Sequence, residues 1–163
     1  MEEKRKKSLF RYIAIMFVVA FLLVLAMTAV VDLEKEERKD NRFYRAMLYV
    51  IADAAHTVLQ VRVHTQGLEK IPTEGRVMLV CNHLDNIDPA FLLHCFRKHP
   101  IAFVAKKEAR MMFLVNKVMP KLLCPYINRE NDREALKTIL KCIQILKEDR
   151  ASVAVFPEGG ILT

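Results

Sequence analysis

Apolar residues are concentrated in the first third of the chain, where they form two separate stretches. Residues 12–31 are twenty residues without a charged side chain. A helix of that length rises about 30 Å, which matches the hydrocarbon thickness of a bilayer. The pattern therefore predicts an uncleaved membrane-spanning helix. Five basic residues precede this stretch and five follow it, so the flanking charges do not predict its orientation.

The second stretch, residues 43–61, is amphipathic. Arg45, Asp53, His56 and Gln60 fall near one helical face, and the opposite face is apolar. Such a helix suits a membrane surface or packing on the first helix. The alternative is a core helix of the domain that follows. We expect residues 1–61 to form a membrane anchor.

From residue 62 the pattern changes to short apolar runs that alternate with amphipathic stretches. The apolar runs predict strands, and the amphipathic stretches between them predict helices. We expect the strands to be buried, except for the first one at 61–67 and the short segment 126–129. Asn131 and Glu134 form a capping-box pattern at the start of the last helix. The predicted strands lie at 61–67, 75–83, 101–108, 126–129 and 151–156, and the helices at 89–100, 109–123 and 131–149.

This alternation predicts an α/β fold with a mostly parallel sheet flanked by helices, preceded by N-terminal membrane-anchoring helices. Residues 62–163 are expected to form the catalytic domain. The four cysteines show no C-x-x-C spacing and indicate buried thiols in a reducing compartment.

The formal net charge is +7, and much of the excess lies between residues 97 and 121, where seven basic residues accompany one acidic residue. A basic surface beside a membrane anchor suits anionic headgroups or phosphorylated substrates. Part of it is also explained as a solvated helix face. Nucleic acid is not expected as a partner, because the basic residues lack interleaved aromatics.

The stretch "CNHLDNIDP" places ionisable groups directly after an apolar run. Loops at the carboxyl ends of strands are where open α/β sheets hold their sites. There His83 can act as a general base, and Asp88 can orient its ring. Asp88 before Pro89 is also a good helix start. A further alternative is a metallohydrolase with His83, Asp85 and Asp88 as ligands, although His-x-His and His-x3-His pairs are absent.

"NHLDNID" is similar to the N-H-x4-D motif of the glycerolipid acyltransferase family, which includes 1-acylglycerol-3-phosphate acyltransferases. "FVAKKE", "YINRE" and "FPEGG" resemble later blocks of that family, in the same order and at similar spacing. The resemblance covers residues 62–160. It departs from the family pattern after Gly159, where threonine, arginine and serine are expected and the chain has Gly160, Ile161 and Leu162, and the family's fourth apolar block is missing.

The resemblance implies that His83 is the catalytic base and that Asp88 orients it. It implies that Arg129 binds a phosphate and that the glycines of "FPEGG" approach an anion closely. A Cys81 nucleophile beside His83 remains an alternative. We expect substrate binding by Asn82, Arg129, Glu158, Gly159 and Gly160.

The implied reaction transfers a fatty acyl group from an acyl thioester to the free hydroxyl of a lysophospholipid. We expect 1-acylglycerol 3-phosphate to give phosphatidate, a step of phospholipid biosynthesis, with acyl-CoA or acyl carrier protein as the donor and without a metal or other cofactor. Membrane lipids are expected partners. The expected location is the cell inner membrane, with a cytoplasmic catalytic domain. Because the domain is expected to be incomplete at its C-terminal end, an inactive membrane-associated fragment is the alternative.

Overall fold

A computed structural model of the chain describes Arg11, Val18, Phe21 and residues 40–159. The chain divides into two compact units, Met1–Lys35 and Glu36–Thr163. The predicted spanning helix 12–31 falls almost wholly outside the described residues. Among the residues that are described, none of the helices has the length and apolar content needed to cross a membrane.

Three parallel strands form the main sheet of the second unit. They are β1 (Met78–Val80), β2 (Ile101–Phe103) and β5 (Ser152–Val155), in the order β1-β5-β2. Strands β3 (Ala105–Lys106) and β4 (Tyr126–Ile127) form a second parallel pair. The parallel sheets confirm the predicted α/β class.

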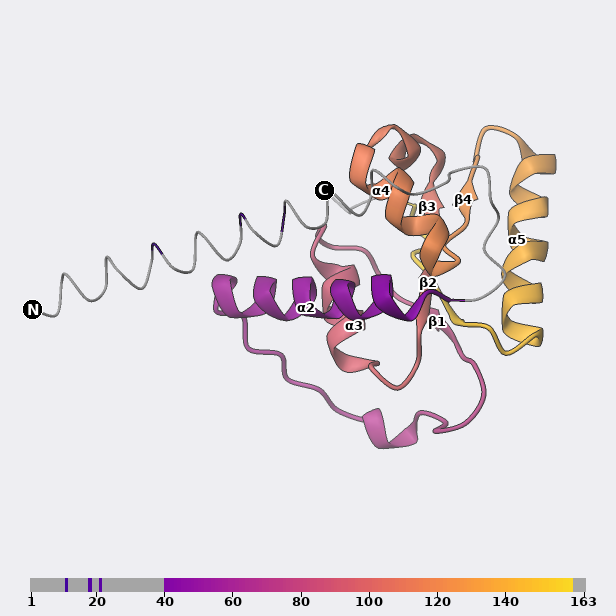
Figure 1. Cartoon of the computed structure of the whole chain (residues 1–163). Helices are drawn as coiled ribbons and strands as arrows, with labels where there is room; N and C mark the ends of the chain where they lie inside the picture. Colours follow the sequence, from indigo (N-terminus) through magenta and orange to yellow (C-terminus); the bar gives the residue numbers. More distant parts are fainter. Residues whose placement is uncertain (1–10, 12–17, 19–20, 22–39, 160–163) are drawn as a thin grey trace, which may run out of the picture. The chain divides into compact units, whose positions relative to one another are not determined.

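Helices lie on both sides of the main sheet. In Figure 1, α2 and α3 lie together on one side and α5 lies on the other. Buried apolar side chains of β2, β5 and α5 form the core, with Ile101, Val153 and Ile145 fully enclosed. The α-helices are α2 (Arg42–Leu59), α3 (Asp88–Cys95), α4 (Phe113–Val118) and α5 (Asp132–Lys147), and the 3-10 helices are η1 (Leu68–Lys70), η2 (Lys107–Met111) and η3 (Met119–Leu122).

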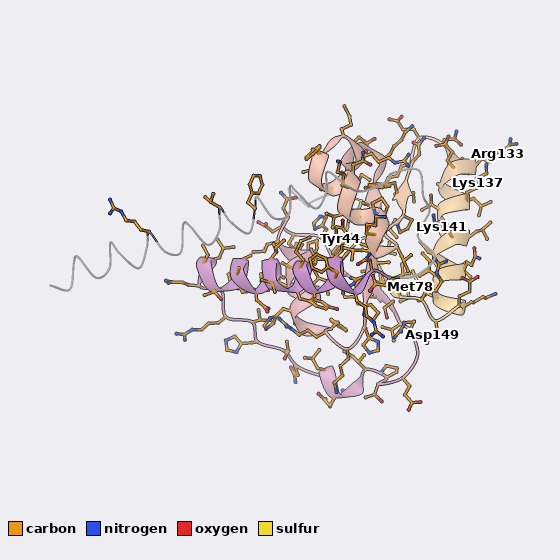
Figure 2. The ribbon with its side chains drawn as sticks, viewed as in Figure 1. Tyr44, Met78, Arg133, Lys137, Lys141 and Asp149 are labelled. Atoms are coloured by element: carbon orange, nitrogen blue, oxygen red, sulfur yellow. The ribbon has the colours of Figure 1, made fainter. Side chains whose placement is uncertain are left out.

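Helix α5 begins where its sequence predicts. The side chain of Asn131 accepts a hydrogen bond from the Glu134 amide at 3.2 Å. The reciprocal half of the capping box is replaced, because the Glu134 carboxylate accepts from the Asn128 side chain. The apolar side chains of α5 remain largely exposed on one face, and Figure 2 shows Arg133, Lys137 and Lys141 following one another along the helix.

Helix α2 turns its polar face toward the domain. The Arg45 guanidinium is buried, and it donates to the carbonyl of Ile101 at 2.6 Å and to Asp40. The apolar residues Val50 and Val58 are instead 67% and 56% exposed. Helix α2 thus packs on α3 within the unit that begins at Glu36, as the core-helix alternative expects, while its outward face is apolar and exposed.

Several predicted elements differ in the structure. Residues 61–67 were predicted as a strand but are irregular, because no described strand pairs with them. Strand β1 is short and exposed rather than buried, since it lies at a sheet edge with β5 as its only partner among the described strands. The predicted helix 109–123 is broken into η2, α4 and η3, and α4 ends at Val118, shortly before Pro120.

Candidate active site

The candidate site lies where β1 and β5 end. These strands are parallel neighbours, so their carboxyl ends meet at the same edge of the sheet. The pairing continues one residue beyond β1, where the amide of Cys81 donates to the carbonyl of Val155 at 3.2 Å. The loop that carries His83 therefore begins beside the turn that starts at Phe156.

His83 and Asp88 form the predicted pair. Nδ1 of His83 lies 2.9 Å from Oδ2 of Asp88, and both side chains are largely buried, at 19% and 18% exposure. The same carboxylate oxygen accepts hydrogen bonds from the amides of Leu84 at 2.7 Å and Asp85 at 2.9 Å. Asp88 is the first residue of α3, so one carboxylate both closes the loop and holds the imidazole.

The protonation state of Asp88 determines which ring nitrogen of His83 is free. Burial acts to raise the pKa of the Asp88 carboxyl, but hydrogen bonds from the Asp85 amide, the His83 ring and the Leu84 amide outweigh burial and lower it. Asp88 is therefore ionised at neutral pH and can only accept. Nδ1 of His83 must carry the proton, which leaves the Nε2 lone pair available as a base.

The ring of His83 is also held by an aromatic neighbour that the sequence did not single out. Phe156 stacks on it, with ring centroids 4.4 Å apart and an angle of 24° between the planes. Phe156 is the first residue after β5 and the first letter of "FPEGG". Its place beside the end of β1 could have been found only from the strand order.

Arg129 connects the "YINRE" and "FPEGG" blocks. It follows β4, and its guanidinium donates to the carbonyl of Gly159. Gly159 has a φ of +76°, and a Cβ added there would overlap the Arg129 guanidinium. A side chain at position 159 is therefore disfavoured by the backbone conformation, and it would also make the Arg129 guanidinium shift.

The other predicted substrate-binding residues have simpler surroundings. Asn82 and Glu158 are exposed, and Arg129 is bonded to the backbone of Gly159 rather than to the Glu158 carboxylate. The amide of Gly159 donates to the carbonyl of Phe156 at 3.1 Å and closes the turn, so it is not free for an anion. Gly160 lies outside the described residues.

Two alternatives for this site lose support. Oδ1 of Asp85 accepts from the Ile87 amide at 3.1 Å, and the described residues contain no close set of ligand atoms that combines Asp85, His83 and Asp88. A metallohydrolase centre there is therefore not favoured. Burial, with the charge of Asp88, raises the pKa of the Cys81 thiol, which disfavours the thiolate that a nucleophile requires.

A histidine base oriented by a carboxylate, with an arginine held by a glycine turn at the same sheet edge, agrees with the family resemblance of the motifs. The family model described as Acyltransferase matches residues 62–163. The chain belongs to the acyltransferase family. The match begins within the compact unit Glu36–Thr163 and after α2, so the predicted boundary at residue 61 stays a prediction.

Three curated relatives carry similar names. A 1-acyl-sn-glycerol-3-phosphate acyltransferase of Borreliella burgdorferi is 29% identical over 61% of this chain and 39% of its own length. Proteins named probable 1-acyl-sn-glycerol-3-phosphate acyltransferase from Mycoplasma pneumoniae and Mycoplasma genitalium are each 34% identical, over 61% and 56% of this chain and 38% and 35% of theirs. The chain thus matches less than two-fifths of the length of these acyltransferases. No solved structure matches it.

Proposed function

We propose that this chain carries the catalytic residues of a lysophospholipid acyltransferase that converts 1-acylglycerol 3-phosphate to phosphatidate. The observation that carries the proposal is the contact of 2.9 Å between Nδ1 of His83 and Oδ2 of Asp88, at the edge of the sheet where β5 ends. The names of the similar acyltransferases support the same acceptor.

The reaction requires a deprotonated hydroxyl and a thiol leaving group. Nε2 of His83 takes the proton of the acceptor hydroxyl as its oxygen attacks the thioester carbonyl. The tetrahedral intermediate then expels the thiolate, the carbon–sulfur bond breaks, and the imidazolium returns the proton to sulfur. Asp88 holds the ring and stabilises its charged form, which makes it the orienting partner. The donor is acyl-CoA or an acylated carrier protein.

Arg129 is proposed to bind the acceptor's phosphate. In the described part of the chain its guanidinium bonds to a carbonyl and forms no ion pair with a carboxylate, so its charge is not neutralised by a neighbouring side chain. A guanidinium with remaining donors suits the two-pronged recognition of a phosphate. Gly159 would thereby position the headgroup by positioning Arg129.

We also propose attachment to the inner membrane, with the site on the cytoplasmic side. Two features of the described residues support contact with lipid. The outward face of α2 is apolar, and the segment Met111, Met112 and Phe113 is 89%, 60% and 58% exposed beside the basic residues of η2. Apolar side chains flanked by positive charge favour an anionic bilayer surface.

The experiment is an acyl-transfer assay on the purified chain in detergent with palmitoyl-CoA and 1-acylglycerol 3-phosphate, following thiol release and phosphatidate formation together. His83→Ala should lower turnover by roughly 100-fold or more, the usual contribution of a general base. His64→Ala, at an exposed histidine outside the site, is the matched control. Equal turnover in His83→Ala and wild type would remove His83 from the mechanism. Thiol release without phosphatidate would indicate thioester hydrolysis instead.

A further inference from the structure

A second cluster of titratable residues lies away from the candidate active site, between α2 and α3. Asp53 and His56 come from consecutive turns of α2, and His94 comes from the last turn of α3. Each offers a ligand atom, and these three atoms lie within 4.8 Å of one another. Nδ1 of His94 is 3.2 Å from Oδ1 of Asp53, and the two imidazole rings have centroids 4.8 Å apart.

His56 is the unusual member of this cluster. His56 is only 7% exposed, and neither ring nitrogen has a hydrogen-bond partner in the structure. Its described ring neighbours are His94 and the apolar Phe91. A buried polar group without a partner is costly, and an imidazole carries at least one lone pair that can accept a ligand. His56 therefore points to a ligand that the protein alone does not supply.

We propose that Asp53, His56 and His94 bind a divalent transition-metal ion of the Zn²⁺ class, which ties α2 to α3. Two imidazoles and one carboxylate form a donor set that Zn²⁺ accepts, with a fourth position left for water. At zinc–ligand distances of about 2.0–2.1 Å, tetrahedral ligand atoms lie about 3.4 Å apart, so the widest pair must close by about 1.4 Å. His94 and Asp53 are 45% and 42% exposed and have room to make that movement.

Arg97 opposes this ion. Its guanidinium contacts Oδ1 of Asp53, and this hydrogen bond is the main reason that the pKa of Asp53 is lowered. Arg97 is 47% exposed and can swing into solvent. Metal and guanidinium thus compete for one carboxylate, and the like charges repel. Removing Arg97 should consequently strengthen metal binding, which is the reverse of what removing a ligand does.

The test is a Zn²⁺ titration of the full chain, freed of metal by chelation and held in detergent, against a chromophoric chelator. One Zn²⁺ per chain is expected. His94→Asn and Asp53→Asn, both at exposed positions, should each weaken binding by roughly tenfold or more. His64→Asn is the matched control and should change nothing, while Arg97→Gln should tighten binding several-fold. Because the site differs from the His83 centre, His83→Ala should bind Zn²⁺ as wild type does.

Two further measurements separate the proposal from other binding modes. Free Zn²⁺ at about 100 times the wild-type Kd should raise the Tm of wild type by about 5–10 °C and that of His94→Asn by about half as much or less, because its Kd is roughly tenfold higher or more. Cys95 follows His94 directly in the sequence but is not one of the proposed ligands. Co²⁺ in place of Zn²⁺ should therefore give no thiolate-to-metal charge-transfer band. Substoichiometric binding, equal affinity in His94→Asn and wild type, a thiolate band, or weaker binding in Arg97→Gln would each overturn the proposal.

Discussion

Replacing Gly159 by alanine is expected to disable phosphate binding without touching His83. The new Cβ would overlap the Arg129 guanidinium, so that side chain has to leave its place. Arg129 is exposed in the structure, so the charge pair becomes desolvated only when the phosphate binds. Losing one partner of the desolvated pair costs about 2–5 kcal/mol, which is roughly 30-fold or more in use of 1-acylglycerol 3-phosphate. The strain of a left-handed alanine lowers the free energy of unfolding by about 1–2 kcal/mol but does not act on the headgroup.

Gly75 provides the matched control. Its φ is +75°, nearly the same as at Gly159, yet an added Cβ meets nothing within 4 Å. Gly75→Ala therefore reports the backbone strain alone, and it should lower stability while leaving acceptor kinetics unchanged. A loss of activity in Gly75→Ala equal to that in Gly159→Ala would mean that strain, and not displacement of Arg129, causes the effect.

The assay is a pair of titrations, one that varies the acceptor and one that varies the thioester donor. The loss in Gly159→Ala should appear in the acceptor titration. The double variant Gly159→Ala/Arg129→Ala should be no worse than the more damaged single variant, because both remove one interaction. Arg129→Lys should lose less activity than Arg129→Ala, since lysine keeps the positive charge but lacks the planar guanidinium. The headgroup assignment would be refuted if the double variant lost activity by the product of the two single losses, or if the loss appeared mainly in the donor titration.

Three other outcomes are expected. Cys81→Ser should keep most of its turnover, because burial keeps the thiol protonated; a loss as large as in His83→Ala would indicate a thiol nucleophile. Despite burial, hydrogen bonds hold the pKa of Asp88 below its ordinary value, so its contribution to stability is present above the ordinary carboxyl pKa and is lost as pH falls through the lower folded value. The gap in unfolding free energy between wild type and Asp88→Asn, measured in denaturant, should thus be constant above about pH 5 and shrink as the pH falls from there to about pH 2; a gap that stays constant over that range would contradict this. The full chain should stay with membranes in high salt, because insertion of apolar groups is not screened; release by salt alone would leave only the basic surface as the attachment.

Local signals predicted the parts of the fold that depend on nearby residues. The period of α5 and the cap at Asn131 placed that helix, and the apolar run of β5 placed a buried strand. The His83–Asp88 contact also follows from a short loop, since the two residues are five positions apart and one carboxylate closes the turn. These features could be predicted because their signals lie in residues close together in the sequence.

Features that depend on distant partners could not be predicted in the same way. The periodicity of α2 defined its two faces but not which one packs inward, because that choice rests on Arg45 finding the carbonyls of Ile101 and Leu122. The exposure of β1 follows from its place at the edge of the sheet, and the stacking of Phe156 on His83 follows from β5 lying beside β1. The order of the strands depends on pairing between distant segments, so no single segment predicts it.

The central place of β5 also sets a sequence of events during synthesis. Strands β1 and β2 pair with β5 and not with each other, and the bond from the Val77 amide to the Ser152 hydroxyl joins residues 75 positions apart. At about 5–20 residues per second, the ribosome needs several seconds to deliver β5 after β1. The apolar N-terminal stretch emerges well before that. Under the proposed membrane attachment, His83 therefore gains its aromatic support from Phe156 only after the nascent chain has had time to meet a bilayer.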